Sequence, residues 1–117
     1  SKRPYSRSER VSDSMRSILA NIFISQIQIK GSGLLTISKV KVTDDLKIAK
    51  IYISFLDNSR SVKELIGDII VKKNVIKNLI SNEIKLKYIP ELRFFYDDTM
   101  EQSDKINQLM NSIKYND

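Results

Sequence analysis

Apolar residues recur with helical spacing between positions 62 and 87, and the rest of the chain is organised around this stretch. They fall into two sets, and within each set the gaps of three, one and four residues are typical of an amphipathic helix. The polar junction Lys72-Lys73-Asn74 separates the two sets. The pattern therefore predicts two short helices with a break between them. Asn74 is the expected pivot, because Asn tolerates the left-handed backbone conformation better than most residues other than Gly.

An earlier helix with one apolar face is predicted to run to about Gln28. Ser6 and Glu9 have the spacing of a capping box at its start, and Ser8 is an alternative N-cap. Residues 1–8 are basic and polar, and we expect them to form a flexible arm. The Gly-Ser-Gly turn at 31–33 ends the helix. The apolar face consists of Val11, Met15, Ile18, Leu19, Ile22, Phe23 and Ile27.

Three segments alternate between apolar and polar residues, as strands with one buried face do. They span residues 35–42, 49–56 and 92–96. The first segment changes phase after Ile37, and an extra residue near Ser38-Lys39, a β-bulge, would keep one face buried. The first two strands are predicted to pair in antiparallel orientation. Pro90 ends the helical pattern before the third strand.

A last amphipathic segment covers residues 103–113, and residues 114–117 are predicted to fray. The predicted order is helix, two strands, two helices joined by a kink, strand and helix. For 117 residues this order predicts a single domain of the α+β class, in which helices pack on one face of a three-stranded sheet. The apolar residues of the last segment are Ile106, Leu109, Met110 and Ile113.

Basic residues outnumber acidic ones over most of the chain, and the formal net charge is +6. Residues 90–117 are the exception, with six acidic and three basic residues. A basic body of this kind is compatible with nucleic-acid binding, and a solubilising lysine surface accounts for the same composition.

The chain contains neither cysteine nor histidine. Their absence excludes disulfides, thiolate metal sites and a cysteine nucleophile, and it removes the commonest general base and metal ligand. No apolar run is long enough to span a bilayer, and the basic N-terminus shows no apolar core of a signal peptide. We therefore expect a cytoplasmic protein without a membrane segment, a cofactor or a resident metal.

The helix junction at Lys72-Lys73-Asn74 is the first candidate for a binding site. A break leaves backbone N–H groups at the start of the second helix, and these groups and the helix dipole favour an anion. Lys72, Lys73 and Lys77 surround the same point. The arrangement predicts a phosphate-binding site, and a plain helix with a solvated lysine face is an equally good interpretation.

Further cations and three aromatic residues extend the candidate nucleic-acid surface. Tyr5, Tyr52 and Phe95 are the aromatic residues placed to stack on bases. Covering the helix layer or the second face of the sheet is the simpler role for Tyr52 and Phe95. The candidate RNA contacts are Lys72, Lys73, Asn74, Lys77, Lys85 and Lys87 along the broken helix, Arg7, Arg10 and Arg16 around the first helix, and Lys39, Lys41, Lys47 and Lys50 on the strand pair.

Clustered carboxylates support an enzyme as the competing interpretation. Asp97, Asp98 and Glu101 form one cluster that would suit a divalent cation. Asp44 and Asp45 form an acidic pair, but aspartates in a turn usually bond to their own backbone. Because carboxylates in turns and at helix starts need no catalytic role, we favour a binding protein over an enzyme.

Four stretches carry a specific combination of motifs. They are Arg10-Val11 with the helix that follows, residues 37–55 (ISKVKVTDDLKIAKIYISF), the broken helix, and residues 89–98 (IPELRFFYDD). In this order, and over nearly the whole chain, they resemble the ribosome-binding factor A family of bacteria.

The resemblance implies a type-II K-homology-like fold and a non-catalytic role. Members of the family bind the small (30S) ribosomal subunit and its 16S rRNA, assist late processing of that RNA, and matter for growth in the cold. Their helix–kink–helix typically has Ala-x-Gly at the junction, where this chain has Lys72-Lys73-Asn74. The resemblance therefore implies a cytoplasmic, monomeric RNA-binding protein, and the alternative is a general basic RNA-binding protein that is not specific to the ribosome.

Overall fold

The computed structural model describes residues 5–115, whose elements follow the predicted order and confirm the α+β class. The predicted flexible arm at 1–8 and the predicted frayed tail at 114–117 lie partly outside the described residues. Arg7 and Ser8 already belong to the first helix, and Lys114 and Tyr115 belong to the last one, so these parts of the predicted arm and tail are wrong. The elements are α1 (Arg7–Ser25), β1 (Leu34–Val42), β2 (Ile48–Leu56), α2 (Val62–Val71), α3 (Lys73–Glu83), β3 (Glu91–Tyr96) and α4 (Thr99–Tyr115).

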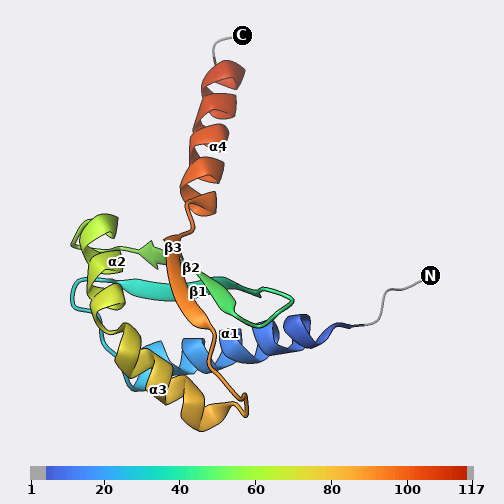
Figure 1. Ribbon diagram of the computed structural model, residues 1–117. Coiled ribbons are helices and arrows are strands. Elements are labelled where there is room, and N and C mark those ends of the chain that lie inside the picture. The colour runs from blue at the N-terminus through green and yellow to red at the C-terminus, as the bar shows by residue number, and fades with distance from the viewer. Residues whose placement is uncertain (1–4, 116–117) are drawn as a thin grey trace.

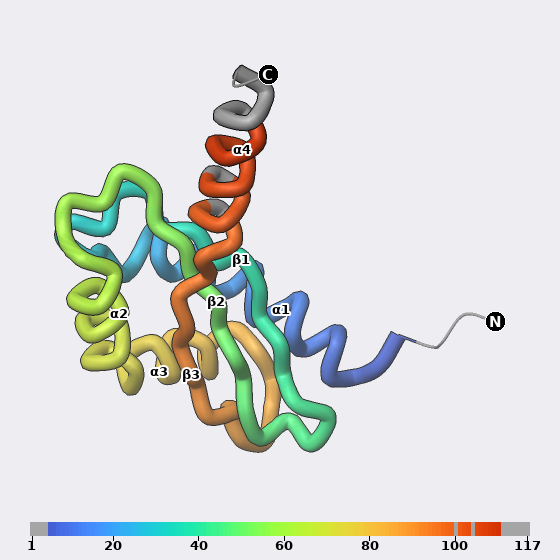
Figure 2. Tube along the Cα trace, turned by 90° about the horizontal axis from the view of Figure 1, so that it is seen from above, coloured from blue at the N-terminus to red at the C-terminus, as the bar shows by residue number. Residues whose placement is uncertain are grey.

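The strands form one sheet in the order β1-β2-β3, and Figure 2 shows them side by side. β1 and β2 are antiparallel, as predicted, and their register shifts between Ile37 and Lys39, which confirms the predicted bulge. β3 lies parallel to β2. A parallel neighbour requires a crossover connection, which α2 and α3 supply between β2 and β3.

Helices α1, α2 and α3 cover one face of the sheet and leave the other face open (Figure 1). On the covered face, Ala49, Ile51 and Ile53 of β2 are fully buried. Each covering helix contributes apolar side chains spaced four residues apart, which lie on one side of a helix. The predicted packing of helices on one face is therefore confirmed. The fully buried helical residues are Met15, Leu19 and Ile22 of α1, Leu65 and Ile69 of α2, and Ile76 and Ile80 of α3.

Ser6 is the N-cap of α1 and has Glu9 at the predicted spacing. The Ser6 side chain accepts a hydrogen bond from the Glu9 backbone N–H at 3.2 Å, and the Ser6 hydroxyl donates to Glu9 Oε1 at 3.1 Å. Ser8 is not the N-cap. It is buried inside the first turn, and its hydroxyl donates to Asp44 Oδ1 at 3.0 Å. This bond attaches the start of α1 to the turn between β1 and β2.

The end of α1 lies at Ser25, before the predicted Gln28. The backbone N–H groups of Gln26 and Ile27 both donate to the Ile22 carbonyl oxygen at 2.8 Å, so the chain tightens and leaves the helix. Ile27 stays buried although it lies outside the helix. The apolar pattern therefore marked a buried residue correctly but placed the end of the helix too late.

The turn between α1 and β1 depends on a glycine. Gly33 has a φ of 60°, and a Cβ there would overlap the carbonyl oxygen of Leu56 at the end of β2. Glycine alone combines this backbone conformation with so close an approach. The turn thereby sets the start of β1 directly beside the end of β2.

Helix α4 projects away from the rest of the molecule (Figures 1 and 2). It includes the predicted segment 103–113 but begins earlier, at Thr99. Its apolar side chains Ile106, Leu109 and Met110 are each more than half exposed. The predicted helix is therefore present, and these three side chains add nothing to the core.

Candidate nucleic-acid interface

The break between α2 and α3 is confirmed, but its pivot is Lys72 and not Asn74. Lys72 has φ −89° and ψ 8°, and its backbone N–H donates to the Asp68 and Ile69 carbonyl oxygens at 3.3 and 3.0 Å. This conformation lies in the sparsely populated region between helix and strand, and one such residue redirects a helix axis. Asn74 lies inside the first turn of α3. The left-handed conformation expected for Asn74 is wrong, because the described non-glycine residues with positive φ are Leu46 and Asp57.

The start of α3 concentrates positive charge. No side chain of the described residues caps this helix, and its N-cap is itself the lysine Lys72. Cations are unfavourable at the positive end of a helix dipole, whereas an anion is stabilised there. Lys72 is exposed, and Lys73 and Lys77 are half-buried. The junction therefore offers backbone N–H groups and lysine side chains to one phosphate-sized anion.

Apolar side chains surround this junction. Ile70, Val71 and Val75 are 50%, 84% and 55% exposed. Single exposed apolar residues are common, but a group of three beside clustered lysines indicates a contact surface more than a solvated face. The junction would thus bind a partner through both charge and apolar contact.

Arg60 is a nearby cation that is already paired with carboxylates of α2. Its guanidinium donates to Asp68 Oδ2 at 2.7 Å, to Glu64 Oε2 at 3.4 Å and to the Lys30 carbonyl oxygen at 2.9 Å. The hydrogen bond from Arg60 is the main reason that the pKa of Asp68 lies below its usual value, and the charge of Lys72 adds to the effect. Arg60 therefore fixes the start of α2 against the turn after α1.

A second basic group forms where the start of α1 meets the end of α3. Arg7, Arg10 and Lys85 share the lining of a hollow of about 340 Å³ with Val11, Ser14, Ile84 and Leu86. Arg16 is not part of this group. Six residues correspond to roughly 120° around a helix, so Arg16 lies on a different flank of α1 from Arg10.

The chain beyond α3 is extended, although the sequence pattern predicted helix to residue 87. α3 ends at Glu83, and Ile84 has φ −125° and ψ 134°. Ile84 and Leu86 turn inward and pack against the core, while Lys85 and Lys87 are exposed. Alternation of this kind is the period of extended chain, and here tertiary packing overrides the helical pattern.

The third basic group lies on the open face of the sheet. Lys41 of β1 is paired with Lys50 of β2, and Lys50 is paired with Arg93 of β3. Lys39 is also exposed on this face, whereas Lys47 lies in the turn between β1 and β2. Sequence reasoning missed Arg93, although its alternation with Leu92 and Phe94 placed it on the polar side of the third strand.

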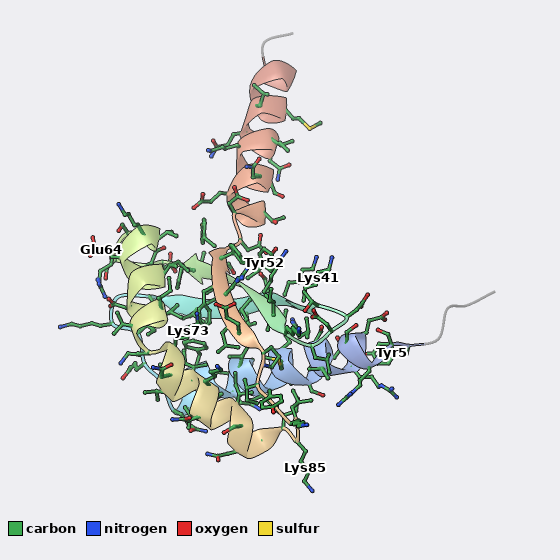
Figure 3. All side chains as sticks on the ribbon, viewed as in Figure 1. Tyr5, Lys41, Tyr52, Glu64, Lys73 and Lys85 are labelled. Carbon is green, nitrogen blue, oxygen red and sulfur yellow. The ribbon has the colours of Figure 1, made fainter. Side chains whose placement is uncertain are left out.

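These groups lie on different sides of the molecule. In Figure 3, Lys73 and Lys85 lie on the helical side of the sheet, and Lys41 and Tyr52 lie on the other side. The structure therefore brings together the cations of the junction, and separately those of α1 and Lys85, but it does not join either group to the strand lysines. One flat partner cannot contact all of the predicted residues at once.

Tyr52 and Phe95 lie on the second, open face of the sheet, one of the two positions expected for them, and not over the helix layer. They stack on each other on the open face, with ring centroids 5.4 Å apart and an interplanar angle of 27°. Lys39 Nζ lies 6.0 Å from the centre of the Tyr52 ring. Phe94 is buried in the core, whereas the Tyr96 hydroxyl donates to Glu101, which raises the pKa of Tyr96 to about 12.

The acidic residues of the two candidate clusters accept hydrogen bonds in turns and at the start of α4. Asp45 accepts from the Thr43 hydroxyl at 2.6 Å and from the Lys47 N–H at 3.1 Å, and these bonds lower its pKa. Asp97 accepts from Ser38 and Thr99, and Glu101 accepts from Tyr96. Within the part of the chain that the structure describes, no three such residues gather as metal ligands.

None of the described helices is long and apolar enough to cross a membrane.

Comparison with known proteins places this geometry in a family. The sequence model of ribosome-binding factor A matches residues 7–110, almost the whole chain. The chain belongs to the ribosome-binding factor A family. The ribosome-binding factor A of Staphylococcus carnosus is 32% identical over 111 residues, which cover 95% of this chain and 96% of that protein.

Solved structures of ribosome-binding factor A share the fold. The crystal structure of the Thermus thermophilus protein aligns with a TM-score of 0.67 at 13% identity and covers 76% of this chain and 93% of that one. A model of Thermus thermophilus ribosome-binding factor A, fitted into a cryo-EM map of a 30S complex, aligns with a TM-score of 0.62 at 14% identity, over 74% and 90% of the two chains. The K-homology-like fold expected from the sequence is therefore confirmed.

Proposed function

We propose that this protein is a ribosome assembly factor that binds the small ribosomal subunit and its 16S rRNA in the bacterial cytoplasm. It acts as one RNA-binding domain, without a catalytic step, and assists late maturation of the rRNA, with most effect in the cold. The observation that carries the proposal is the family match over residues 7–110. A family relative of the same fold has been fitted into a map of a 30S complex, which supports the choice of subunit.

Electrostatic contact with phosphates is the proposed basis of binding. The cations of the helix junction and those around Arg10 and Lys85 lie on the helical side, where they would neutralise rRNA phosphates. Each phosphate contact releases counterions, so the affinity falls steeply with salt. Binding that favours one conformation of the immature subunit shifts its population toward that conformation. Such a mechanism needs no nucleophile or acid–base pair.

The alternative is a general basic RNA-binding protein. Its support is the distribution of cations over both sides of the sheet, which a nonspecific binder also shows. Excess bulk tRNA and duplex DNA separate the two functions. A specific factor stays bound to small subunits in their presence, whereas a general binder is displaced.

The maturation role is tested by complementation. A bacterium that lacks its own ribosome-binding factor A is supplied with this chain and grown in the cold, and the ratio of precursor to mature 16S rRNA is measured. We expect the chain to lower this ratio, and the Lys72→Glu/Lys73→Glu variant, produced at the same level, to lower it less. An unchanged ratio with well-expressed wild-type protein would overturn the maturation role.

A further inference from the structure

The open face of the sheet carries two rows of side chains that cross all three strands. Within each row the residues are register partners in neighbouring strands. The rows are two residues apart along each strand, or about 7 Å. Figure 2 looks onto this face and shows the strands in front of α1, with α4 beyond one end of the sheet. We call these side chains the open-face platform, which consists of Lys41, Lys50 and Arg93 in one row and Lys39, Tyr52 and Phe95 in the other.

The aromatic row is arranged as a stack with one open end. Lys39 and Phe95 lie on opposite sides of Tyr52, because β1 and β3 flank β2. β3 is the last strand of the sheet, so the outer side of Phe95 lies at the sheet edge, and the residue is 40% exposed. An unpaired base placed against that side would continue the stack Lys39–Tyr52–Phe95.

The bulge in β1 is what adds Lys39 to this row. Leu35 and Ile37 face the core, so strict alternation would turn Lys39 inward as well. The extra residue, Ser38, restores Val40 to the core and turns Lys39 outward beside Lys41. Its hydroxyl donates to Asp97 Oδ2 at 2.6 Å, which fixes the bulge. The strand is thus built to present both lysines on the open face.

The basic row is unfavourable unless an anion binds it. Like charges directly opposite each other on a sheet are destabilising, yet Lys41, Lys50 and Arg93 are neighbours across three strands. Arg93 alone of the platform cations has a carboxylate partner among the described residues, Glu91 Oε2 at 3.2 Å. The net positive row lies beside the aromatic row. The phosphates of one single-stranded nucleic acid would therefore meet the cations while its bases meet the aromatic rings.

We propose that the open-face platform binds an unpaired segment of RNA. One base stacks on Phe95 and Tyr52, and flanking phosphates contact Lys41, Lys50 and Arg93. Bases in a duplex are already stacked and do not reach such a surface, so the ligand is single-stranded. The proposal rests on the proposed function in taking rRNA as the source of this segment. It adds a second contact, on the side of the sheet opposite the helix junction.

The test measures the affinity of the whole chain for fluorescein-labelled octauridylate by anisotropy at low salt. The platform variant is Tyr52→Leu/Phe95→Leu, which keeps apolar volume and removes the aromatic rings. The control is Tyr88→Leu, because Tyr88 is 76% exposed and has Lys87 Nζ 5.6 Å from its ring centre, away from the platform. We expect the affinity of the platform variant for octauridylate to fall by about fivefold or more, because base stacking is lost. The control should bind octauridylate like wild type.

A second measurement avoids any effect of substitution on folding. The wild-type chain is photocrosslinked to an octamer containing 4-thiouridine, and the crosslinked peptides are identified. The proposal predicts crosslinks in the peptides that contain Tyr52 and Phe95. Crosslinks confined to α2, α3 and the start of α1 would overturn it, as would equal octauridylate affinity of the folded platform variant and wild type.

The outcomes also separate this proposal from the proposed function. Octauridylate binding that needs Tyr52 and Phe95, without binding to small subunits, would support the platform and overturn the ribosomal role. Binding to small subunits with no affinity for octauridylate would overturn the platform alone. In a third outcome, unlabelled polyglutamate displaces the labelled octauridylate as well as unlabelled octauridylate does, and the platform variant keeps its affinity for octauridylate. This result would mean that the face binds acidic protein segments, and it would also overturn the platform.

Discussion

At the scale of single residues, Asp97 connects three elements through its carboxylate. Its Oδ2 accepts from the Ser38 hydroxyl at 2.6 Å, and its Oδ1 accepts from the Thr99 backbone N–H at 3.0 Å. These hydrogen bonds hold the pKa of Asp97 below its ordinary value of 3.8, and the charge of Lys39 contributes. The bulge of β1, the end of β3 and the start of α4 thus share one acceptor. The sequence had indicated a turn carboxylate here, with a cation ligand as the less favoured alternative, but not this connection.

Asp97→Asn tests this connection through pH. The folded-state pKa of Asp97 is lowered, so its contribution to stability is present above its unfolded value near 3.8 and is lost as pH falls through the folded value. We expect Asp97→Asn to be less stable than wild type at neutral pH and to lose less stability in acid. Urea unfolding at neutral pH and below pH 4 measures both. Asp98→Asn, at an exposed neighbour, is the control, and an identical loss in acid for wild type and Asp97→Asn would contradict the assignment.

Ile53 tests the covered face of the sheet. It is fully buried in the central strand, so Ile53→Ala leaves a cavity as well as losing apolar burial. We expect the free energy of unfolding to fall by about 2–5 kcal/mol. The matched change at the end of the same strand, Leu56→Ala, removes a side chain that is 52% exposed and should cost about 0.5 kcal/mol or less. Equal losses in the two variants would mean that the two faces are assigned wrongly.

At the scale of elements, the helix junction shows both what the sequence pattern could predict and what it could not. The polar interruption at Lys72-Lys73-Asn74 located the break, because two apolar stripes cannot face one core through a straight helix. It did not identify the pivot, since several residues reach the conformation of Lys72 and no left-handed residue is needed. The end of α3 was also missed, because Ile84 fits both a helical and an extended pattern until its packing partners are known.

The bulge shows the opposite case. The change of phase after Ile37 predicted it, because only an added residue returns Val40 to the core. The grouping of side chains on the open face was beyond sequence reasoning, since it depends on the register of β3 against β2. Alternation placed Arg93 on the polar side of the third strand, but only the register puts it beside Lys50 and puts Phe95 beside Tyr52.

The Lys72→Glu/Lys73→Glu variant tests the junction as an element. Acidic residues are favourable at the N-terminus of α3 but unfavourable at the C-terminus of α2, which Lys72 caps. These opposing effects are each about 0.3–1 kcal/mol, so the fold should be retained with little net change in stability. Binding to small subunits should weaken, because two phosphate-attracting charges are reversed. The control Lys63→Glu/Lys105→Glu makes the same change in net charge at exposed lysines of α2 and α4. We expect binding to weaken more in the junction variant than in the control. Equal weakening would mean that the junction contributes to binding only through net charge.

At the scale of the whole molecule, the sheet divides two surfaces of different character. The helical side offers the junction and the group around Arg10, and the open side offers stacked aromatic rings beside a row of cations. With both surfaces binding RNA as proposed, the protein would lie between two RNA segments. Helix α4 stands apart from both, and the buried apolar residues of the described chain all lie between Val11 and Phe94.

Removal of α4 tests this separation. A chain that ends at Asp98 loses the Tyr96–Glu101 hydrogen bond and the Thr99 contact of Asp97, but none of the described core residues. We expect the cooperative unfolding transition to remain, and its urea midpoint to shift little compared with Ile53→Ala. Loss of cooperative unfolding on truncation would show that α4 packs on the body of the molecule.

Co-sedimentation with purified small subunits, large subunits and whole ribosomes over a salt series tests whether this chain is a small-subunit factor. We expect it to pellet selectively with small subunits, and its apparent affinity to fall steeply as salt rises, because phosphate contacts release counterions. Absence of pelleting with small subunits at low salt, or equal pelleting with every particle, would contradict the ribosomal role proposed for it.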